Sequence, residues 1–186
     1  MKAPKILIAG IGNIFLGDDG FGPEVIRRLG DSSFGEAVRV TDFGIRGYDL
    51  AFAIADGHDA TILVDATPRG DAPGTLYLLE LDPAKMELAK AAVDGHSLTP
   101  VAALQMVRSL GFDFKGRFYL VGCEPLVLEC DDGEMKLSEP VETAVPRAIA
   151  MIQKLVRQFS EMESEQTTHP ASSRPVTRRY DHVLHS

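Results

Sequence analysis

The hydrophobic and polar positions along the chain follow two alternating patterns. Five short runs of β-branched and other apolar residues are typical of strands. These runs cover residues 5–9, 38–41, 61–64, 75–81 and 117–122. Segments between them have helical spacing, at residues 24–29, 48–55 and 101–111. Pro23 lies near the start of the first helix, and Thr99 with Pro100 supplies an N-cap and a first-turn proline for the third, which Gly111 ends.

This order of strands and helices predicts a single α/β domain with a largely parallel sheet. The link between the third and fourth strands, residues 66–74, is too short to hold a crossover helix. We therefore expect the fourth strand to pair antiparallel with a neighbour, which makes the five-stranded sheet a mixed one.

A longer apolar stripe lies near the C-terminus. From Val141 to Phe159, apolar residues recur every three or four positions, as on a helix that packs against a sheet. Pro146 interrupts the first turns, so we expect a kink there or a helix that begins near it. After Phe159 the periodicity ends, and Ser, Thr, Pro and charged residues take over. We predict a folded domain over residues 1–160 and a disordered tail over residues 161–186.

Composition narrows the classes of function. The 186 residues are 45% hydrophobic and 25% charged, with a formal net charge of -8. An acidic surface is repelled by phosphate backbones and anionic lipids, so we expect neither nucleic acid nor a membrane as partner. No apolar run is long enough to span a bilayer and the N-terminus lacks a signal-peptide core, so we expect a cytoplasmic protein. Cys123 and Cys130 form neither a C-x-x-C pair nor a disulfide framework.

The glycine-rich stretch "GIGNIFLGDDGFG", which follows the first predicted strand, raises the question of what it binds. A dinucleotide-binding loop needs a third glycine at the position of Phe15. Asp18 and Asp19 would repel a phosphate, and the P-loop pattern G-x-x-x-x-G-K-[ST] is absent from the chain. Two carboxylates in such a turn suit a cation instead.

Two more polar residues lie where the chain leads to the same edge of the predicted sheet. Asp65 ends the apolar run "TILV", and His96 precedes the helix that Thr99 caps. Ligands bind at the carboxyl ends of the strands in such sheets, so two aspartates and a histidine could form an O, O, N site for a borderline divalent metal. Each residue alone is more typical of a cap, a turn or a solvent-facing side chain. Their joint appearance at three successive strand-end loops brings the metal interpretation level with that one, so the residues leave both open.

Five segments together resemble the hydrogenase maturation endopeptidases, which remove a C-terminal peptide from the large subunit of nickel-iron hydrogenases. They are "GIGNIFLGDDGFG", "DFGIRGYDL", "ILVDAT", "DGHSLTP" and "LVGCEP". The resemblance implies a twisted mixed sheet with helices on both faces. It also implies that Asp19, Asp65 and His96 are the nickel-binding and catalytic residues, with the choice of Asp19 over Asp18 resting on the alignment.

The resemblance further implies how substrate is recognised. The segment from Asp42, with Gly44 and Gly47, matches a family motif that shapes the substrate cleft. Arg46 is either a contact for the precursor tail or an ordinary surface arginine. Nickel would be supplied by the substrate, the large-subunit precursor, so that cleavage follows metal insertion.

The residues leave the bond-breaking step open. A metal could polarise the scissile carbonyl or acidify a water, with Asp18 or Asp42 as general base. The chain has no H-E-x-x-H or G-x-S-x-G motif, and Cys123 has no assigned histidine partner, so no nucleophile is named. Two rivals are a non-catalytic nickel-binding assembly factor and a nucleotide-binding module; the missing glycine and the two aspartates disfavour the second.

Overall fold

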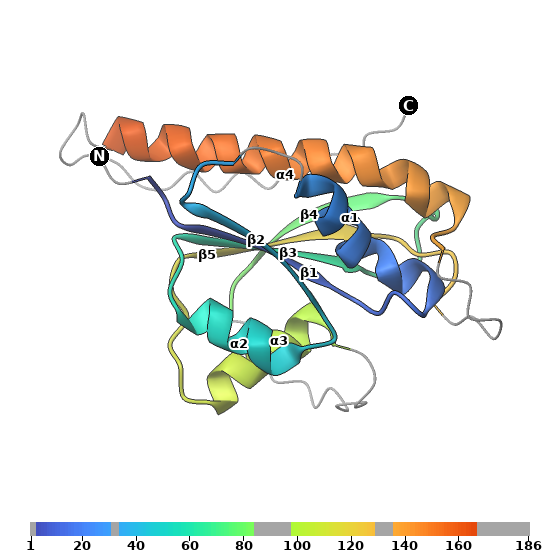
Figure 1. Ribbon diagram of the computed structural model, residues 1–186, viewed down its shortest axis with the longest axis horizontal. Helices are drawn as coiled ribbons and strands as arrows, with labels where there is room; N and C mark the ends of the chain where they lie inside the picture. Colours follow the sequence, from blue (N-terminus) through green and yellow to red (C-terminus); the bar gives the residue numbers. More distant parts are fainter. Residues whose placement is uncertain (1–2, 31–33, 84–97, 129–135, 167–186) are drawn as a thin grey trace.

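The computed structural model describes residues 3–30, 34–83, 98–128 and 136–166, and the side chains among them up to residue 161. They form one five-stranded sheet flanked by helices (Figure 1). The strands are β1 (Ile6–Ile11), β2 (Val38–Gly44), β3 (Ala60–Ala66), β4 (Leu76–Leu81) and β5 (Arg117–Cys123). The helices are the 3-10 helix η1 (Gly17–Gly20), α1 (Phe21–Leu29), α2 (Gly47–Ala55), α3 (Pro100–Ser109) and α4 (Glu139–Gln166).

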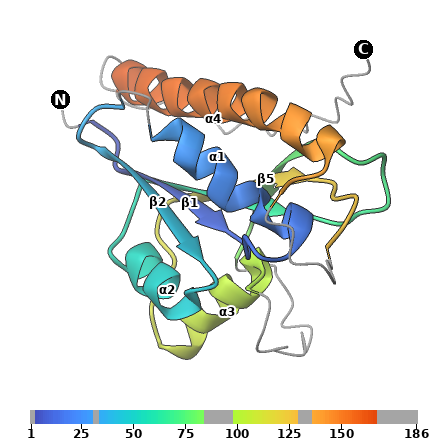
Figure 2. The ribbon, with the colours of Figure 1, turned by 45° about the vertical axis from the view of Figure 1, so that its right-hand side comes forward.

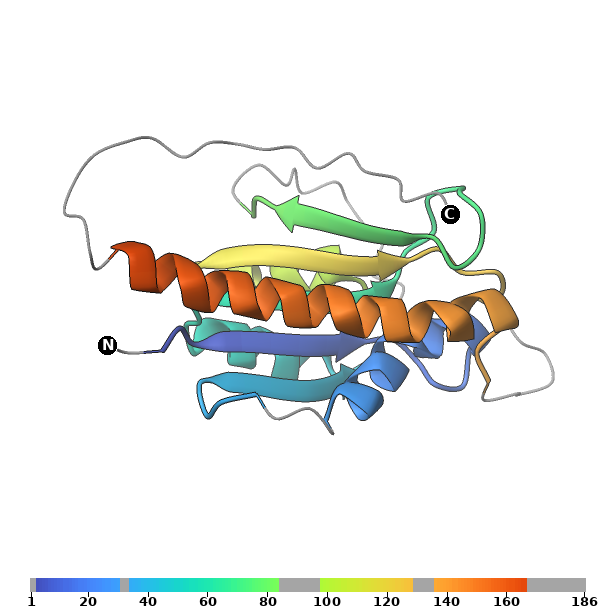
Figure 3. The same ribbon diagram turned by 90° about the horizontal axis from the view of Figure 1, so that it is seen from above.

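The sheet has the order β2-β1-β3-β5-β4. The first four strands in this order are mutually parallel, whereas β4 pairs antiparallel with β5 (Figure 3). The mixed, mostly parallel sheet and the antiparallel fourth strand are therefore confirmed. The short β3–β4 link explains the reversal. It is too short for the crossover that would carry the chain back to the other end of the sheet, so β4 runs in the opposite direction.

Helices cover both faces, as the resemblance implied. Helices α1 and α4 lie on one face, and α2 with α3 lies on the other (Figure 1). The alternation of side chains along β1 supplies both cores: Ile6 and Ile8 pack with α1 and α4, while Leu7 and Ala9 pack with α2 and α3. Strand β1, which lies inside the sheet, is thus apolar throughout because both of its faces are buried.

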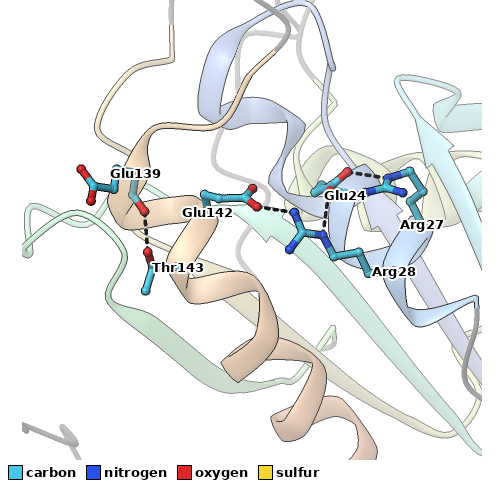
Figure 4. A network of polar contacts seen from close by, with 6 residues as sticks. All are labelled: Glu24, Arg27, Arg28, Glu139, Glu142 and Thr143. Carbon is cyan, nitrogen blue, oxygen red and sulfur yellow. Dashed lines mark hydrogen bonds and ion pairs between the residues drawn. The ribbon is translucent and has the colours of Figure 1, made fainter.

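An ion-pair network joins α1 to α4 on the outer side of that layer (Figure 4). Glu24 accepts hydrogen bonds from Arg27 and Arg28, which lower its pKa, and Arg28 also pairs with Glu142 of α4. Pairs this exposed contribute at most about 1 kcal/mol each. The network therefore orients the two helices, while the apolar contacts beneath them hold the layer together.

The third helix begins as expected, with the Thr99 hydroxyl accepting a hydrogen bond from the Ala102 amide. The last helix differs from expectation. Helix α4 begins at Glu139 and continues through Pro146, so a start near Pro146 is wrong. Its apolar residues pack on the sheet along its length, and this packing outweighs the hydrogen bond that proline removes.

Helix α4 also ends later than expected, at Gln166, inside the segment predicted to be disordered. Residues 167–186, the rest of that segment, lie outside the described residues. No helix among the described residues is both long enough and apolar enough to cross a membrane.

Candidate functional site

The carboxyl ends of the four parallel strands meet at one edge of the sheet (Figure 2). In register, Ile11 of β1 pairs with Gly44 of β2, and Ala66 of β3 pairs with Cys123 of β5. The segments that follow these strands therefore converge, and they contain the acidic residues that the sequence singled out.

The loop after β1 is folded tightly by its glycines. Gly12 has a φ of 130°, and a Cβ built on it would lie 1.9 Å from the Asp19 carbonyl oxygen. A Cβ on Gly22 would lie 2.2 Å from the Ile11 carbonyl oxygen and 2.4 Å from that of Val64. Only glycine permits these approaches, so the stretch serves to bring η1 and the start of α1 down onto the ends of β1 and β3.

Asp19 and Asp65 are brought together at this edge. The Asn13 amide donates to the Asp19 carboxylate over 2.6 Å, which fixes the half-buried side chain, but burial raises its pKa more than this hydrogen bond lowers it. Asp65 is 5% exposed at the end of a fully buried strand whose other residues, apart from Thr61, are apolar. Burial, together with the neighbouring charge of Asp19, raises the pKa of Asp65 well above its usual range. The site therefore favours a proton or a cation between two carboxyl groups.

Asp18, the residue before Asp19 in η1, is 0% exposed. Its carboxylate accepts hydrogen bonds from the amides of Leu126, Val127 and Ser138 and from the Ser138 hydroxyl, over 2.7–2.9 Å. A side chain so enclosed is removed from any water at the strand ends, which disfavours Asp18 as the general base. The adjacent aspartates thus have separate surroundings.

The Asp42 segment begins in the last residues of β2 and lies beside the loop after β1. Asp42 is exposed and accepts a hydrogen bond from the Gly44 amide over 2.8 Å, while the Gly44 carbonyl accepts one from Gly12. A Cβ on Gly47 would lie 2.9 Å from Leu98 Cδ1, so this glycine lets α2 approach the segment that leads into α3. Arg46 donates to the Asp42 carbonyl and pairs with Asp49, so in this structure it fastens its own turn.

A further buried carboxylate was missed by the sequence analysis. Glu124, 5% exposed, directly follows β5 and accepts hydrogen bonds from the Arg69 and Gly70 amides and from the Tyr77 hydroxyl. Burial raises its pKa, but these donors outweigh burial and the net pKa is lowered. Its place after a buried strand was the available signal, the same one that pointed to Asp65.

His96 lies outside the described residues, so the third predicted ligand has no structural account. Within the described part of the chain, no three His, Cys, Asp or Glu side chains gather as a metal site. Cys123 is buried in the core beneath the edge, and burial raises its pKa to about 12. A thiol held so firmly protonated is a poor nucleophile, which agrees with its omission from the candidates.

Exposed apolar side chains surround the same edge. Six of them lie in the segments that follow β1, β2 and β5; we name this set the apolar rim. It consists of Ile14, Phe15, Ile45, Tyr48, Leu126 and Val127. A cleft of about 700 Å³ also adjoins the first loop, and Ile14 and Asp42 are among its lining residues. Grouped exposed apolar residues commonly mark a binding surface for another protein chain.

Comparison with known proteins identifies the family. The model of the family described as "Hydrogenase maturation protease" matches residues 23–155. The chain belongs to the hydrogenase maturation proteases. This confirms the resemblance and the expectation of an endopeptidase.

Relatives and solved structures of this family agree. The hydrogenase expression/formation protein HupD of Rhizobium leguminosarum bv. viciae is 30% identical over 158 residues, which cover 84% of this chain and 76% of the relative. The coenzyme F420 hydrogenase subunit delta of Methanothermobacter thermautotrophicus is 33% identical over 80% of this chain and 92% of its own. The hydrogenase maturating endopeptidase HybD from E. coli has a TM-score of 0.66 at 26% identity, covering 83% of this chain and 93% of that one.

Proposed function

We propose that this hydrogenase maturation protease removes the C-terminal peptide of a nickel-iron hydrogenase large-subunit precursor after nickel has been inserted. The observation that carries the proposal is the Asp19–Asp65 pair at the carboxyl edge of the sheet, in a chain of this family. The pair lies among apolar residues and beside an exposed rim, an arrangement suited to a protein substrate.

The metal is part of the substrate in this proposal. Asp19, Asp65 and His96 contact the nickel of the precursor, which supplies a positive charge between two carboxyl groups that repel each other without it. Carboxylate and imidazole donors bind such a metal without the closed thiolate cage of a permanent site. Cleavage therefore depends on metal loading, because a precursor without nickel offers the two carboxyl groups no cation to bind.

The substrate chain is held by the surrounding segments. The Asp42 turn, with Gly44 and Gly47, shapes the approach to the edge, and the apolar rim contacts the precursor on either side of the bond to be cleaved. Asp42 is exposed and stands beside the first loop, so it, rather than Asp18, is available to accept a proton from an attacking water.

The test is mass spectrometry of a large-subunit precursor incubated with the protein, with nickel inserted in one sample and absent in the other. We expect a C-terminal peptide to be released only from the nickel-loaded precursor. Release from both samples would overturn the dependence on nickel. A precursor that stays intact in both, while another protease of this family trims it, would favour a non-catalytic assembly factor.

Two variants test the residues. His96→Ala and Asp65→Asn are expected to abolish release while the circular dichroism spectrum stays that of the parent. Matched controls are His58→Ala, on the histidine just before β3 at the opposite edge, and the exposed Asp113→Asn. If both site variants process at the parent rate, the site is misplaced.

A further inference from the structure

Asp18 binds two segments of the chain that lie more than 100 residues away from it in sequence. One carboxylate oxygen accepts from the Ser138 amide over 2.7 Å, and the other accepts from the Leu126 and Val127 amides over 2.8 and 2.9 Å. The Ser138 hydroxyl adds a fourth hydrogen bond at 2.9 Å. One side chain thus holds both the segment that follows β5 and the residue just before α4.

The backbone around Asp18 strengthens the same junction. The Asp18 amide donates to the Val127 carbonyl over 2.9 Å, so the two residues exchange hydrogen bonds in both directions. Gly17, with a φ of 55°, precedes it, and a Cβ there would lie 3.0 Å from the same carbonyl oxygen. The two segments are therefore in close backbone contact at this point, and a larger residue at 17 would separate them.

The junction lies between the two parts of the candidate site. Asp19 is the next residue in η1, and its carboxylate is near enough to Asp65 for its charge to act on that side chain. Leu126 and Val127, whose amides Asp18 binds, turn their side chains to solvent as part of the apolar rim. The distance between the Asp19 carboxylate and this side of the rim is thus set through Asp18.

We propose that Asp18 is a positioning residue that holds the Asp19 turn and the Leu126–Val127 segment as one unit. Bound substrate and the reacting carboxylates thereby keep a fixed relative position. This inference rests on the proposed function of the site. A buried carboxylate needs hydrogen-bond donors, and a fully satisfied set of them fixes one arrangement of the chain. Asp18 has four donors, three backbone amides and the Ser138 hydroxyl. Asp18 therefore acts on the reaction through Asp19 and never touches substrate itself.

The test compares Asp18→Asn, Ser138→Ala and Glu124→Gln. Asparagine keeps one acceptor oxygen but turns an NH₂ group toward amides that can only donate, whereas Ser138→Ala removes only the hydroxyl bond. Glu124→Gln is the matched control, because Glu124 is also a buried, multiply hydrogen-bonded carboxylate but holds a different segment. All are assayed on nickel-loaded precursor, at a temperature where circular dichroism shows each variant folded.

We expect kcat to fall about 100-fold for Asp18→Asn, since small misplacements of reacting groups cost about that much. The fall is about threefold for Ser138→Ala and within about twofold for Glu124→Gln, whose contacts are separate. The melting temperatures of Asp18→Asn and Glu124→Gln should fall by similar amounts. Parent kcat in folded Asp18→Asn would overturn the proposal, because it would show that Asp18 serves stability alone.

Hydrogen exchange measured by mass spectrometry tests the same point without substrate. In Asp18→Asn, exchange should rise together in peptides covering residues 13–20 and 126–128, whereas in Glu124→Gln it should rise at residues 69–71. A rise at 126–128 with parent exchange at 13–20 would refute the joint unit. If the parent protein cleaves no precursor, the proposed function fails and this exchange pattern still decides the role of Asp18.

Discussion

Asp65 and Glu124 end neighbouring strands, have the same 5% exposure, and have opposite pKa shifts. Burial works against the charged form of both. At Glu124 the hydroxyl of Tyr77 and the amides after β3 outweigh burial, while at Asp65 the charge of Asp19 adds to it. Burial alone therefore does not mark a functional carboxylate at this edge. The number of hydrogen-bond donors separates Glu124, whose charged form is stabilised, from Asp65, whose charged form is not.

The largest effect is expected from Asp65→Asn, which removes the charge but keeps the shape. Processing of nickel-loaded precursor should be abolished, because one of the three groups proposed to contact the nickel loses its charge. Loss of activity should be accompanied by a gain in stability of the metal-free protein at neutral pH. The free energy of unfolding of parent and variant is measured by urea unfolding in the presence of a chelator, with circular dichroism as the signal.

The sign of that gain follows from the raised pKa of Asp65. Below the ordinary value of 3.8, parent and variant both carry a neutral side chain and differ little. As pH rises from there through the raised folded-state pKa, the unfolded parent releases its proton more readily, so the parent loses stability and the variant does not. An unchanged difference from pH 4 to pH 8 would contradict the raised pKa.

Gly12→Ala tests the position of the other member of the pair. A Cβ at this residue meets the Asp19 carbonyl oxygen at 1.9 Å, and its φ of 130° is strained for alanine. The free energy of unfolding should fall by about 3 kcal/mol or more, since backbone must move. Gly70→Ala is a matched control, because Gly70 also has a positive φ but open space where the Cβ would be. Equal losses in the two variants would show that φ strain, and not the contact with Asp19, sets the cost.

Glu124→Gln should do the opposite of Asp65→Asn. It keeps the shape but weakens the hydrogen bonds that Glu124 accepts, so the variant should be about 1–3 kcal/mol less stable at neutral pH. Because the folded-state pKa is lowered, this contribution is present above the ordinary value of 4.5 and is lost as pH falls through the folded-state pKa. The gap between parent and variant should therefore narrow on acidification. A gap that widens with acid would reverse the assignment of the two carboxylates.

The same comparison shows what the sequence could predict. Strand ends are visible in the pattern, so the place of Asp65 at the end of β3 and the mixed sheet were predicted correctly from local signals. The donors that distinguish Glu124 come from Arg69 and Tyr77, more than forty residues away in the chain. For Asp18 they come from residues 108–120 positions away, which is why the two adjacent aspartates looked alike.

The start of α4 could not be predicted from the sequence for a similar reason, because it depends on contacts with distant parts of the chain. Proline is unfavourable inside a helix, and the local pattern favoured a start near Pro146 or a kink there. The start near Pro146 is wrong: the helix begins at Glu139, because the residues on both sides of the proline pack on the sheet. Tertiary burial, which no local window contains, decided the boundary.

The smallest effect is expected at the apolar rim, where no charge changes. Phe15→Ala should raise the KM for the precursor about tenfold with little change in kcat, because it removes binding area that substrate and transition state share. Leu78→Ala is the control, since Leu78 is also exposed and apolar but lies on β4, away from the segments of the rim. Equal KM values for the two variants would show that the apolar rim does not contribute to substrate binding. A fall in kcat confined to Phe15→Ala would instead show that this side chain helps to place the scissile bond against Asp19 and Asp65.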